Sequence, residues 1–321
     1  MPFRSSGTWV PKSPASRKRA KCLALRHTDA PACTAPAIRS PPVRSHCLPK
    51  PMPTPPPRLL TLSRCTLAYR DTGDPPHDAG TPLVLLHGSH GDWRHWSANL
   101  PALSRTHRVL VPDMPCFGAS SSLPGEPEPG DLAQALSEWM AQLDLTGVTL
   151  VGFSFGCLVA TALAQAAPAR VARLMLVHPP GLGITGERGA HIAATASAIA
   201  RSEGRRAGIR ETLTSLMLAD ASKIDEAMID DALSMAQASR LRTTALSRNA
   251  KLPPVLANLP QPLTVVFGDR DPYHAHDLDG RRSRLLQARE DANFVLVRGA
   301  AHWLQRDQPQ AFNKLLLDFA R

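Results

Sequence analysis

The sequence predicts an α/β fold, in which a mostly parallel sheet carries helices on both faces. Runs that are almost continuously apolar alternate along the chain with segments whose apolar residues recur at helical spacing. Strands that are apolar on both sides are typical of parallel sheets covered by helices. With 321 residues, of which 43% are hydrophobic and 20% charged, the chain can bury the core of one large domain.

The first part of the predicted sheet domain spans residues 58–182. Its predicted strands are the two of a hairpin over 59–73 and buried strands over 81–88, over 108–115, from Val148 and over 173–181. An amphipathic helix is predicted from Leu132 to Leu143, with Asp131 as its N-cap and Gln134 at the third helical position. Strands and helices thus alternate, as a parallel sheet requires.

Residues 183–255 break this alternation, because helical patterns follow one another there without strands. The apolar repeats lie at 191–200, 209–218 and 228–236, and Ser222 with Asp225 predicts the cap of the third helix. Strands return in residues 256–321, where we predict strands at 262–272 and 293–303, a helix between them at 278–289 and a last helix at 311–320. The sequence therefore predicts a helical insertion within one sheet domain.

The start of the chain differs in composition from the rest. Residues 1–58 hold eleven Lys or Arg against the single acid Asp29, and thirteen of the 31 prolines. They show neither helical nor alternating apolar periodicity, so they cannot bury enough surface to offset the entropy of ordering the chain. We predict a disordered, basic, proline-rich tail over residues 1–57.

The tail has three interpretations: a segment that binds an anionic partner, a targeting segment, or codons upstream of the true start. Its arginines and serines fit a transit peptide, but its prolines oppose the amphipathic helix that such peptides form. Met52 precedes the first convincing strand, which favours translation from that residue. Because the net charge of +10 lies in the tail, we expect no nucleic acid and no membrane surface as partners of the sheet domain.

The apolar segments do not indicate secretion or a membrane span. No run of about 7 to 15 apolar residues follows the early basic cluster, and nowhere do about 18 run together. We therefore expect a cytoplasmic location, and the sequence leaves the oligomeric state open, a homo-oligomer included. The cysteines form no C-x-x-C and no metal-ligand spacing, so we expect free thiols and no metal at Cys22, Cys33, Cys47, Cys65, Cys116 and Cys157.

The segment VTLVGFSFGC, from Val148 to Cys157, is the strongest functional signal. An apolar run ends in G-x-S-x-G, and small apolar residues at helical spacing follow it. A serine between a strand and a helix sits in a strained turn, so the two flanking positions, Gly152 and Gly156, need residues without bulk. The pattern predicts a nucleophile elbow with Ser154 at its tip.

A nucleophilic serine needs a base to take its proton and a third group to orient that base. In chains with this elbow, the acid and the histidine follow the serine in that order, on turns after strands. His302 follows the apolar run FVLV and is the predicted base. Asp269 and Asp271 share the turn after LTVVF as candidates for the acid. Asp113 is a reserve candidate whose favoured role is to anchor the loop beneath the elbow.

The negative charge that develops on an attacked carbonyl oxygen needs preorganised donors, which backbone amides in a rigid loop can supply. One expected donor is the amide of Phe155, directly after the nucleophile. The other comes from the loop after the strand VLLHG, where Ser89 is the candidate. His87 precedes that loop, and its favoured role is to brace it by side-chain hydrogen bonds.

Five motifs occur in an order that resembles the α/β-hydrolase superfamily over about residues 59–321: LLHGSHGDW, VPDMPCFGASS, GFSFG, GDRDP and GAAHWLQ. The resemblance implies an eight-stranded, mostly parallel sheet, a helical lid over residues 183–255 and no cofactor. It also implies Ser154, Asp271 and His302 as the catalytic triad. Such families usually show G-x-x-D at the acid, which favours Asp271 for that role and leaves Asp269 to the turn.

Within that superfamily, the chain is similar to the carbon-carbon hydrolases that cleave meta-ring-fission products, which tend to show His-Trp-x-Gln, here starting at His302. Their glycine-rich oxyanion loop appears here as HGSHG. Their lid arginine, which holds the substrate carboxylate, is replaced near Asp231 or Ala232. Arg240 and Arg242 are the candidates to substitute for it, or are solvated surface charges.

The predicted lid contains no Phe, Tyr or Trp, so aromatic groups near the site must come from the core, and Trp93, Phe117 and Trp303 are the predicted pocket residues. We predict a serine hydrolase that acts through an acyl-enzyme on a small, uncharged carboxylic ester with an aliphatic or compact acyl group. Two alternatives stay open: a carbon-carbon bond hydrolase, and a non-catalytic hydrolase-like protein that binds a ligand or a partner.

Overall fold

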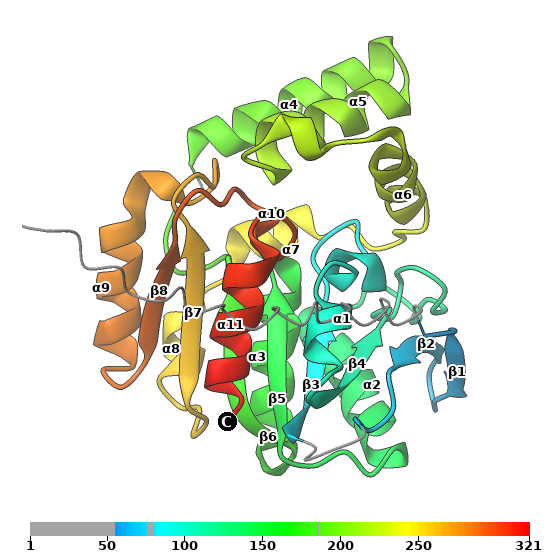
Figure 1. Cartoon of the computed structure of the whole chain (residues 1–321), viewed down its shortest axis with the longest axis vertical. Helices are drawn as coiled ribbons and strands as arrows, with labels where there is room; N and C mark the ends of the chain where they lie inside the picture. Colours follow the sequence, from blue (N-terminus) through cyan, green and yellow to red (C-terminus); the bar gives the residue numbers. More distant parts are fainter. Residues whose placement is uncertain (1–54, 76–79, 185) are drawn as a thin grey trace, which may run out of the picture. The chain divides into compact units, whose positions relative to one another are not determined.

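The protein is described by a computed structural model over residues 55–75, 80–184 and 186–321. Its strands form one eight-stranded sheet in the order β1-β2-β4-β3-β5-β6-β7-β8 (Figure 1). The strands are β1 (Arg58–Thr61), β2 (Thr66–Asp71), β3 (Gly80–Leu86), β4 (His107–Pro112), β5 (Val148–Phe153), β6 (Val171–Val177), β7 (Leu263–Gly268) and β8 (Asn293–Val297). Strands β3 to β8 pair in parallel and β2 pairs antiparallel with both of its neighbours, which confirms the predicted mostly parallel sheet.

Helices join most of the parallel strands. The helices are α1 (Leu100–Leu103), α2 (Pro129–Gln142), α3 (Phe155–Ala166), α4 (Glu187–Ser202), α5 (Arg205–Thr212), α6 (Glu226–Gln237), α7 (Thr244–Asn249), α8 (Pro253–Leu256), α9 (Leu278–Ala288), α10 (Leu304–Asp307) and α11 (Pro309–Phe319). Short turns include the 3-10 helices η1 (Trp93–Trp96) and η5 (Ala275–Asp277) and the π-helical turn η3 (Leu213–Met217). The predicted alternation of strands and helices is confirmed.

The sheet is buried on both faces, and successive residues of a strand enter different core layers. In β3, Val84 and Leu86 belong to the layer that includes helices α2, α3, α8 and α9, whereas Leu83 and Leu85 belong to the layer that includes α1 and α11. All four side chains are fully buried. This two-sided burial explains why the strand reads as a continuous apolar run rather than an alternating one.

Helices α4 to α7 stand between β6 and β7 in the chain, and α4, α5 and α6 lie beyond the strand ends in Figure 1. We call residues 187–249 the helical insertion. The turn η3 connects it to the sheet domain, because its Leu216 and Met217 carbonyls accept hydrogen bonds from the His302 and Trp303 amides at 3.3 and 2.8 Å. Helix α8, whose first three residues fall within the predicted insertion 183–255, packs on α3 and α9, with Leu256 fully buried in the core.

Two predicted helix caps are wrong in their details. Helix α2 begins at Pro129 after the N-cap Glu128, and the amide of Glu128 donates to the Asp131 carboxylate at 3.0 Å. Asp131 is therefore the third helical residue and not the cap, because a proline fits the first helical position. Helix α6 is capped by Asp225, which accepts from the Met228 amide at 2.8 Å, and Ser222 instead bonds Asp220.

The predictions about membrane spans, the tail and the cysteines can be compared with the structure only for the described residues. No helix within the described ranges is long and apolar enough to cross a membrane. The tail predicted for residues 1–57, its start at Met52 and its three cysteines lie outside the described residues, apart from residues 55–57. The other three cysteines, Cys65, Cys116 and Cys157, are buried and free, which confirms the prediction for them.

Candidate active site

Ser154 lies at the junction of β5 and α3 in a backbone conformation that only a tight turn imposes on a serine. Its φ is 51° and its ψ is −119°, in a region that residues with a side chain rarely adopt. A Cβ on Gly152 would lie 2.6 Å from the Gly156 carbonyl oxygen, and a Cβ on Gly156 would lie 2.4 Å from the His87 carbonyl oxygen. Both flanking positions therefore require glycine, as the motif predicts.

Three predicted residues from three different strand ends meet at this turn. Ser154 follows β5, Asp271 follows β7 and His302 follows β8. The His302 Nε2 lies 3.2 Å from the Ser154 Oγ, and the His302 Nδ1 lies 2.9 Å from the Asp271 Oδ2. A proton can thus pass from the serine to the imidazole, whose other nitrogen is held by the carboxylate.

The Asp271 carboxylate is fully buried and saturated with donors. Its Oδ1 accepts from the Tyr273 amide at 2.8 Å, and its Oδ2 contacts the Nδ1 atoms of both His302 and His274. Burial alone would raise the pKa of this carboxyl group. The neighbouring histidines, His302 first and then His274, outweigh that effect and hold the pKa well below its usual range, so Asp271 is ionised.

His178, which no sequence argument singled out, supports the base from behind. The Gly268 amide donates to its Nε2 at 2.6 Å, so the ring proton sits on Nδ1, which bonds the His302 carbonyl at 2.8 Å. Burial lowers the pKa of His178 to about 3, and the ring is therefore neutral. Its Nε2 lies 3.4 Å from Asp271 without a proton to share, so this contact is not an ion pair.

The atoms of His178, Asp271 and His302 that could bind a metal lie within 4.8 Å of one another. Their lone pairs and protons are already committed to partners in the protein, however. The Nε2 of His178 accepts from Gly268, and the Nδ1 of His302 donates to Asp271. This donor set therefore fits a hydrogen-bonded triad better than a metal centre.

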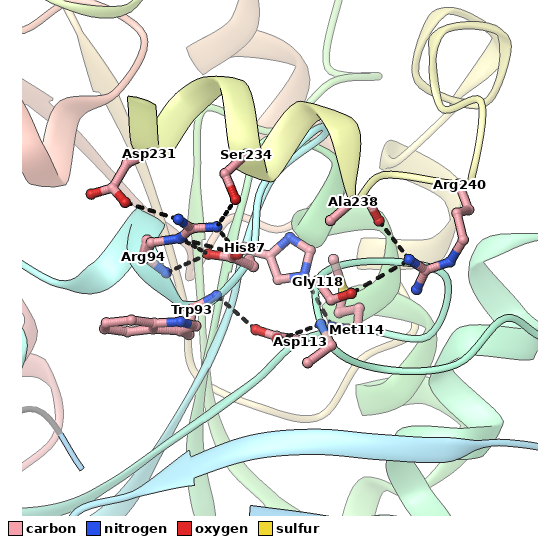
Figure 2. Close-up of polar contacts among 12 residues, drawn as sticks. His87, Trp93, Arg94, Asp113, Met114, Gly118, Asp231, Ser234, Ala238 and Arg240 are labelled. Carbon is pink, nitrogen blue, oxygen red and sulfur yellow. Dashed lines mark hydrogen bonds and ion pairs between the residues drawn. The ribbon is translucent and has the colours of Figure 1, made fainter. Parts of the chain in front are cut away.

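The loop after β3 passes directly over the serine. A Cβ on Gly88 would lie 3.2 Å from the Ser154 Cβ, and Ser89 is the next residue of this loop. His87 fixes this loop, because its Nδ1 bonds the Gly88 carbonyl at 2.8 Å and its Nε2 accepts from the Met114 amide at 3.0 Å (Figure 2). Phe155 opens α3 on the other side of Ser154. Both predicted oxyanion donors thus lie on segments that adjoin the serine, and their role stays a prediction.

The two alternative acids, Asp113 and Asp269, accept hydrogen bonds from backbone amides instead of contacting the base. The Asp113 Oδ1 accepts from the Trp93 amide, and its Oδ2 accepts from the Ala119 amide, each at 3.0 Å (Figure 2). The Asp269 Oδ1 accepts from the Gly299 amide at 2.6 Å. Neither carboxylate contacts His302 within the described part of the chain. The geometry thus favours Asp271 as the partner of the base.

The predicted pocket aromatics lie in different environments. Phe117 is fully buried against His87 and Phe155, so it offers no surface to a ligand in this conformation. Trp303 is 3% exposed, and its indole nitrogen donates to the His95 carbonyl at 2.9 Å. Only Trp93 is partly exposed, with the Arg70 guanidinium 3.7 Å above its ring.

Three arginines around the helical insertion differ in their contacts. Arg94 donates to Asp231 of α6 at 2.8 Å, so Asp231 is paired with the sheet domain (Figure 2). Arg240 is engaged with the carbonyls of Ala238, Gly118 and Ser120. Arg242 is exposed and lines a cavity of about 490 Å³ together with His90 and Arg248.

Two features of the site were missed from sequence. His178 and His274 each follow the end of a parallel strand, β6 and β7, and both face Asp271. For His178 the signal was present, because a polar residue directly after an apolar strand lies at the same sheet edge as the other strand ends. Nothing in the spacing, however, indicates that both rings turn toward one carboxylate.

Comparison with known proteins agrees with this geometry. The model of the Alpha/beta hydrolase family matches residues 83–315. The dihydrolipoyllysine-residue acetyltransferase component of an acetoin cleaving system from Pseudomonas putida is 30% identical over 76% of this chain, which spans 64% of that protein's length. A 2-hydroxy-6-oxononadienedioate/2-hydroxy-6-oxononatrienedioate hydrolase from Pseudomonas putida is 28% identical over 79% of this chain and 91% of its own.

Solved structures share the fold. A carboxylesterase from Bacillus subtilis superposes with a TM-score of 0.70 at 18% identity, over 84% of this chain and 92% of its own. A meta-cleavage product hydrolase from Pseudomonas fluorescens superposes with a TM-score of 0.66 at 23% identity, over 79% and 94%. With the family match extending from β3 to α11, this chain belongs to the alpha/beta hydrolase family.

Proposed function

We propose that the protein is a serine hydrolase that cleaves a small carboxylic ester through an acyl-enzyme. The observation that carries this proposal is the hydrogen-bonded series from Ser154 to His302 to Asp271, with distances of 3.2 and 2.9 Å. The strained conformation of Ser154 adds support, because it presents the hydroxyl clear of β5 and α3.

In the first half-reaction, the Ser154 oxygen attacks the ester carbonyl carbon while the His302 Nε2 takes the hydroxyl proton. Negative charge passes to the carbonyl oxygen, where the amides of Ser89 and Phe155 are the proposed donors. The tetrahedral intermediate collapses as the carbon-oxygen bond to the alcohol breaks. His302 returns its proton to that leaving alkoxide, and the acyl group stays on Ser154.

In the second half-reaction, water replaces the alcohol. His302 takes a proton from the water as its oxygen attacks the acyl carbon, and the charge again develops on the carbonyl oxygen. The bond to Ser154 then breaks, and His302 returns the proton to the serine oxygen. Throughout, the ionised Asp271 stabilises the positive charge on His302, which is the task that a buried carboxylate with a lowered pKa can perform.

The helical insertion is the proposed lid of this site. It is joined to the loop of the base through η3 and to the loop after β3 through Thr243, whose hydroxyl donates to the Ser89 hydroxyl at 2.7 Å. These contacts support an insertion that borders the substrate and limits its size. A small-molecule ester is therefore the proposed partner, and a cytoplasmic location is proposed from the absence of a predicted secretory segment.

Carbon-carbon bond hydrolysis is the second candidate. It is favoured by the identity of 28% to a hydrolase of 2-hydroxy-6-oxononadienedioate over most of both chains. The arginines on the cavity beside His90 are compatible with a substrate that carries a carboxylate. Turnover of a dienoic diketo acid without turnover of short p-nitrophenyl esters would support this candidate over the ester hydrolase.

The proposal is tested by labelling with an active-site fluorophosphonate, which reacts with an activated serine. The wild-type protein should be labelled at Ser154, and Ser154→Ala should not be labelled. Ser202→Ala serves as a matched control, because Ser202 lies at the exposed end of α4 and its hydroxyl bonds only carbonyls of its own helix. Absence of labelling in the folded wild-type protein would favour a non-catalytic ligand-binding protein instead.

A further inference from the structure

The acid of the triad carries a second histidine that the reaction described above does not use. His274 lies three residues after Asp271 and is 5% exposed. Its Nδ1 lies 2.6 Å from the Asp271 Oδ2, whereas the His302 Nδ1 lies 2.9 Å from the same oxygen. One carboxylate oxygen therefore serves two imidazoles.

Both imidazoles are donors to that oxygen. Asp271 is ionised and has no proton to give, so the hydrogen in each contact sits on the histidine nitrogen. Burial lowers the pKa of His274 and outweighs the pull of Asp271, and the Arg281 guanidinium acts in the same direction as burial. His274 is thus a neutral ring with its proton on Nδ1.

The other titratable groups packed around these two rings do not change their protonation state near neutral pH. His178 stacks on His274 and on His302, with interplanar angles of 14° and 18°, and burial lowers its pKa to about 3. Tyr273 meets the edge of His302, and burial raises its pKa to about 12. His95 is buried as well, and that burial is the main cause that lowers its pKa to about 3. None of these three groups titrates together with a base that works near neutral pH.

We propose that His274 is a positioning residue that acts through Asp271. By donating a hydrogen bond to Oδ2, His274 weakens the attraction of the Asp271 carboxylate for the protonated form of His302. His302 can therefore accept the Ser154 proton at lower pH than it could beside an aspartate that bonds only one histidine. The physical basis is that a hydrogen bond to the charged form of a group stabilises that form and weakens its attraction for another proton donor. The proposal rests on the proposed roles of Ser154 and His302.

The test compares two substitutions of His274, one that removes the donor to Asp271 and one that keeps it. His274→Leu removes the donor, and the charge returned to Asp271 should move the acidic limb of the kcat/KM profile to higher pH. We expect roughly one pH unit, the order set by one hydrogen bond to a carboxylate, and about tenfold less activity well below the midpoint. His274→Asn keeps an amide N–H near the position of Nδ1 and should restore the wild-type limb.

His276→Leu is the matched control, because His276 is an exposed histidine on the neighbouring turn η5. Its profile should overlay that of the wild-type protein. Ester turnover is normalised to the fraction of serine labelled by the fluorophosphonate, so that partial unfolding does not imitate a change in the limb. An acidic limb of His274→Leu that coincides with the wild-type limb would overturn the proposal, as would an equal shift in His274→Asn.

A measurement on the unaltered protein covers the case in which His274→Leu does not fold. In protein with isotope-labelled histidine, nitrogen NMR should show His274 protonated on Nδ1 and unprotonated on Nε2 across the whole acidic limb. A His274 that gains a second proton together with His302 would contradict the proposal. Loss of the proposed function has a different signature, because Ser154 would then fail to react while the His274 spectrum stays as described.

Discussion

The strand-end cluster around Ser154 and the helical insertion differ in how each is held. Asp271 and the three histidine rings around it are buried, and the Asp271 carboxylate accepts from three donors of the sheet domain. The insertion is joined to the sheet domain by the Arg94 to Asp231 pair, which solvent reaches, and by the backbone bonds of η3 to His302 and Trp303. The proposed chemistry thus sits in the buried part, and the proposed lid is held in part by a contact that solvent reaches.

Loss of the Ser154 hydroxyl is expected to have the largest effect on activity. Ser154→Ala removes the nucleophile while leaving the buried cluster in place, so we expect kcat to fall by about 10⁶-fold with little change in stability. Ester turnover and thermal unfolding are the two measurements. Residual activity above a hundredth of wild type would assign the nucleophile elsewhere.

The acid comes next in size. Asp271→Asn keeps the shape but cannot accept from both histidines, so we expect His302 to lose its tautomer and kcat to fall by about 10⁴-fold. Asp269→Asn is the matched control from the same turn, because Asp269 bonds only the Gly299 amide among the described residues. A larger loss of kcat in Asp269→Asn than in Asp271→Asn would reverse the assignment of the acid.

The packing of the elbow predicts an effect on folding. Gly156→Ala would place a Cβ 2.4 Å from a backbone carbonyl oxygen that cannot move alone, and we expect a loss of about 2 to 5 kcal/mol in the free energy of unfolding. Gly130→Ala in the first turn of α2 meets nothing within 4 Å and should be neutral or slightly stabilising. Urea denaturation of both variants checks this, and equal stabilities would contradict it.

The tether of the insertion predicts the smallest effect. Arg94 is clamped by Asp92 at 2.7 Å and reaches Asp231 at 2.8 Å, but the Asp231 side chain is 56% exposed. Asp231→Asn should therefore cost about 1 kcal/mol or less in stability, raise KM and leave kcat within twofold. Hydrogen exchange of α6 should rise in this variant, and unchanged exchange with unchanged KM would show that the pair does not hold the insertion.

The sequence predicts the strand-end cluster far better than the helical insertion. The order of Ser154, Asp271 and His302 at strand ends determines where they meet, because the carboxyl ends of parallel strands share one edge. The sequence predicts no helix over α8, because four residues, two of them prolines, are too few to show helical periodicity. Its place in the core follows from contacts with α3 and α9, which no local pattern contains.

The details that failed depend on side-chain geometry. The α2 cap shifted by three residues because Glu128, Pro129 and Asp131 together form a better start than Asp131 alone. Burial of Phe117 and Trp303 depends on how loops fold over the sheet edge, so an aromatic residue in the right motif still turned inward. The convergence of His178 and His274 on one carboxylate is of the same kind, since it depends on ring orientation.

The π-helical turn η3 has a mechanical consequence. Its Leu216 and Met217 carbonyls accept hydrogen bonds from the backbone amides of His302 and Trp303. The loop of the proposed base is therefore fixed by the insertion as well as by β8. An outward swing of the whole insertion would pull on the loop that orients the imidazole. For the proposed lid, substrate entry without displacement of His302 therefore requires that α4, α5 or α6 moves while η3 stays bound to the sheet domain.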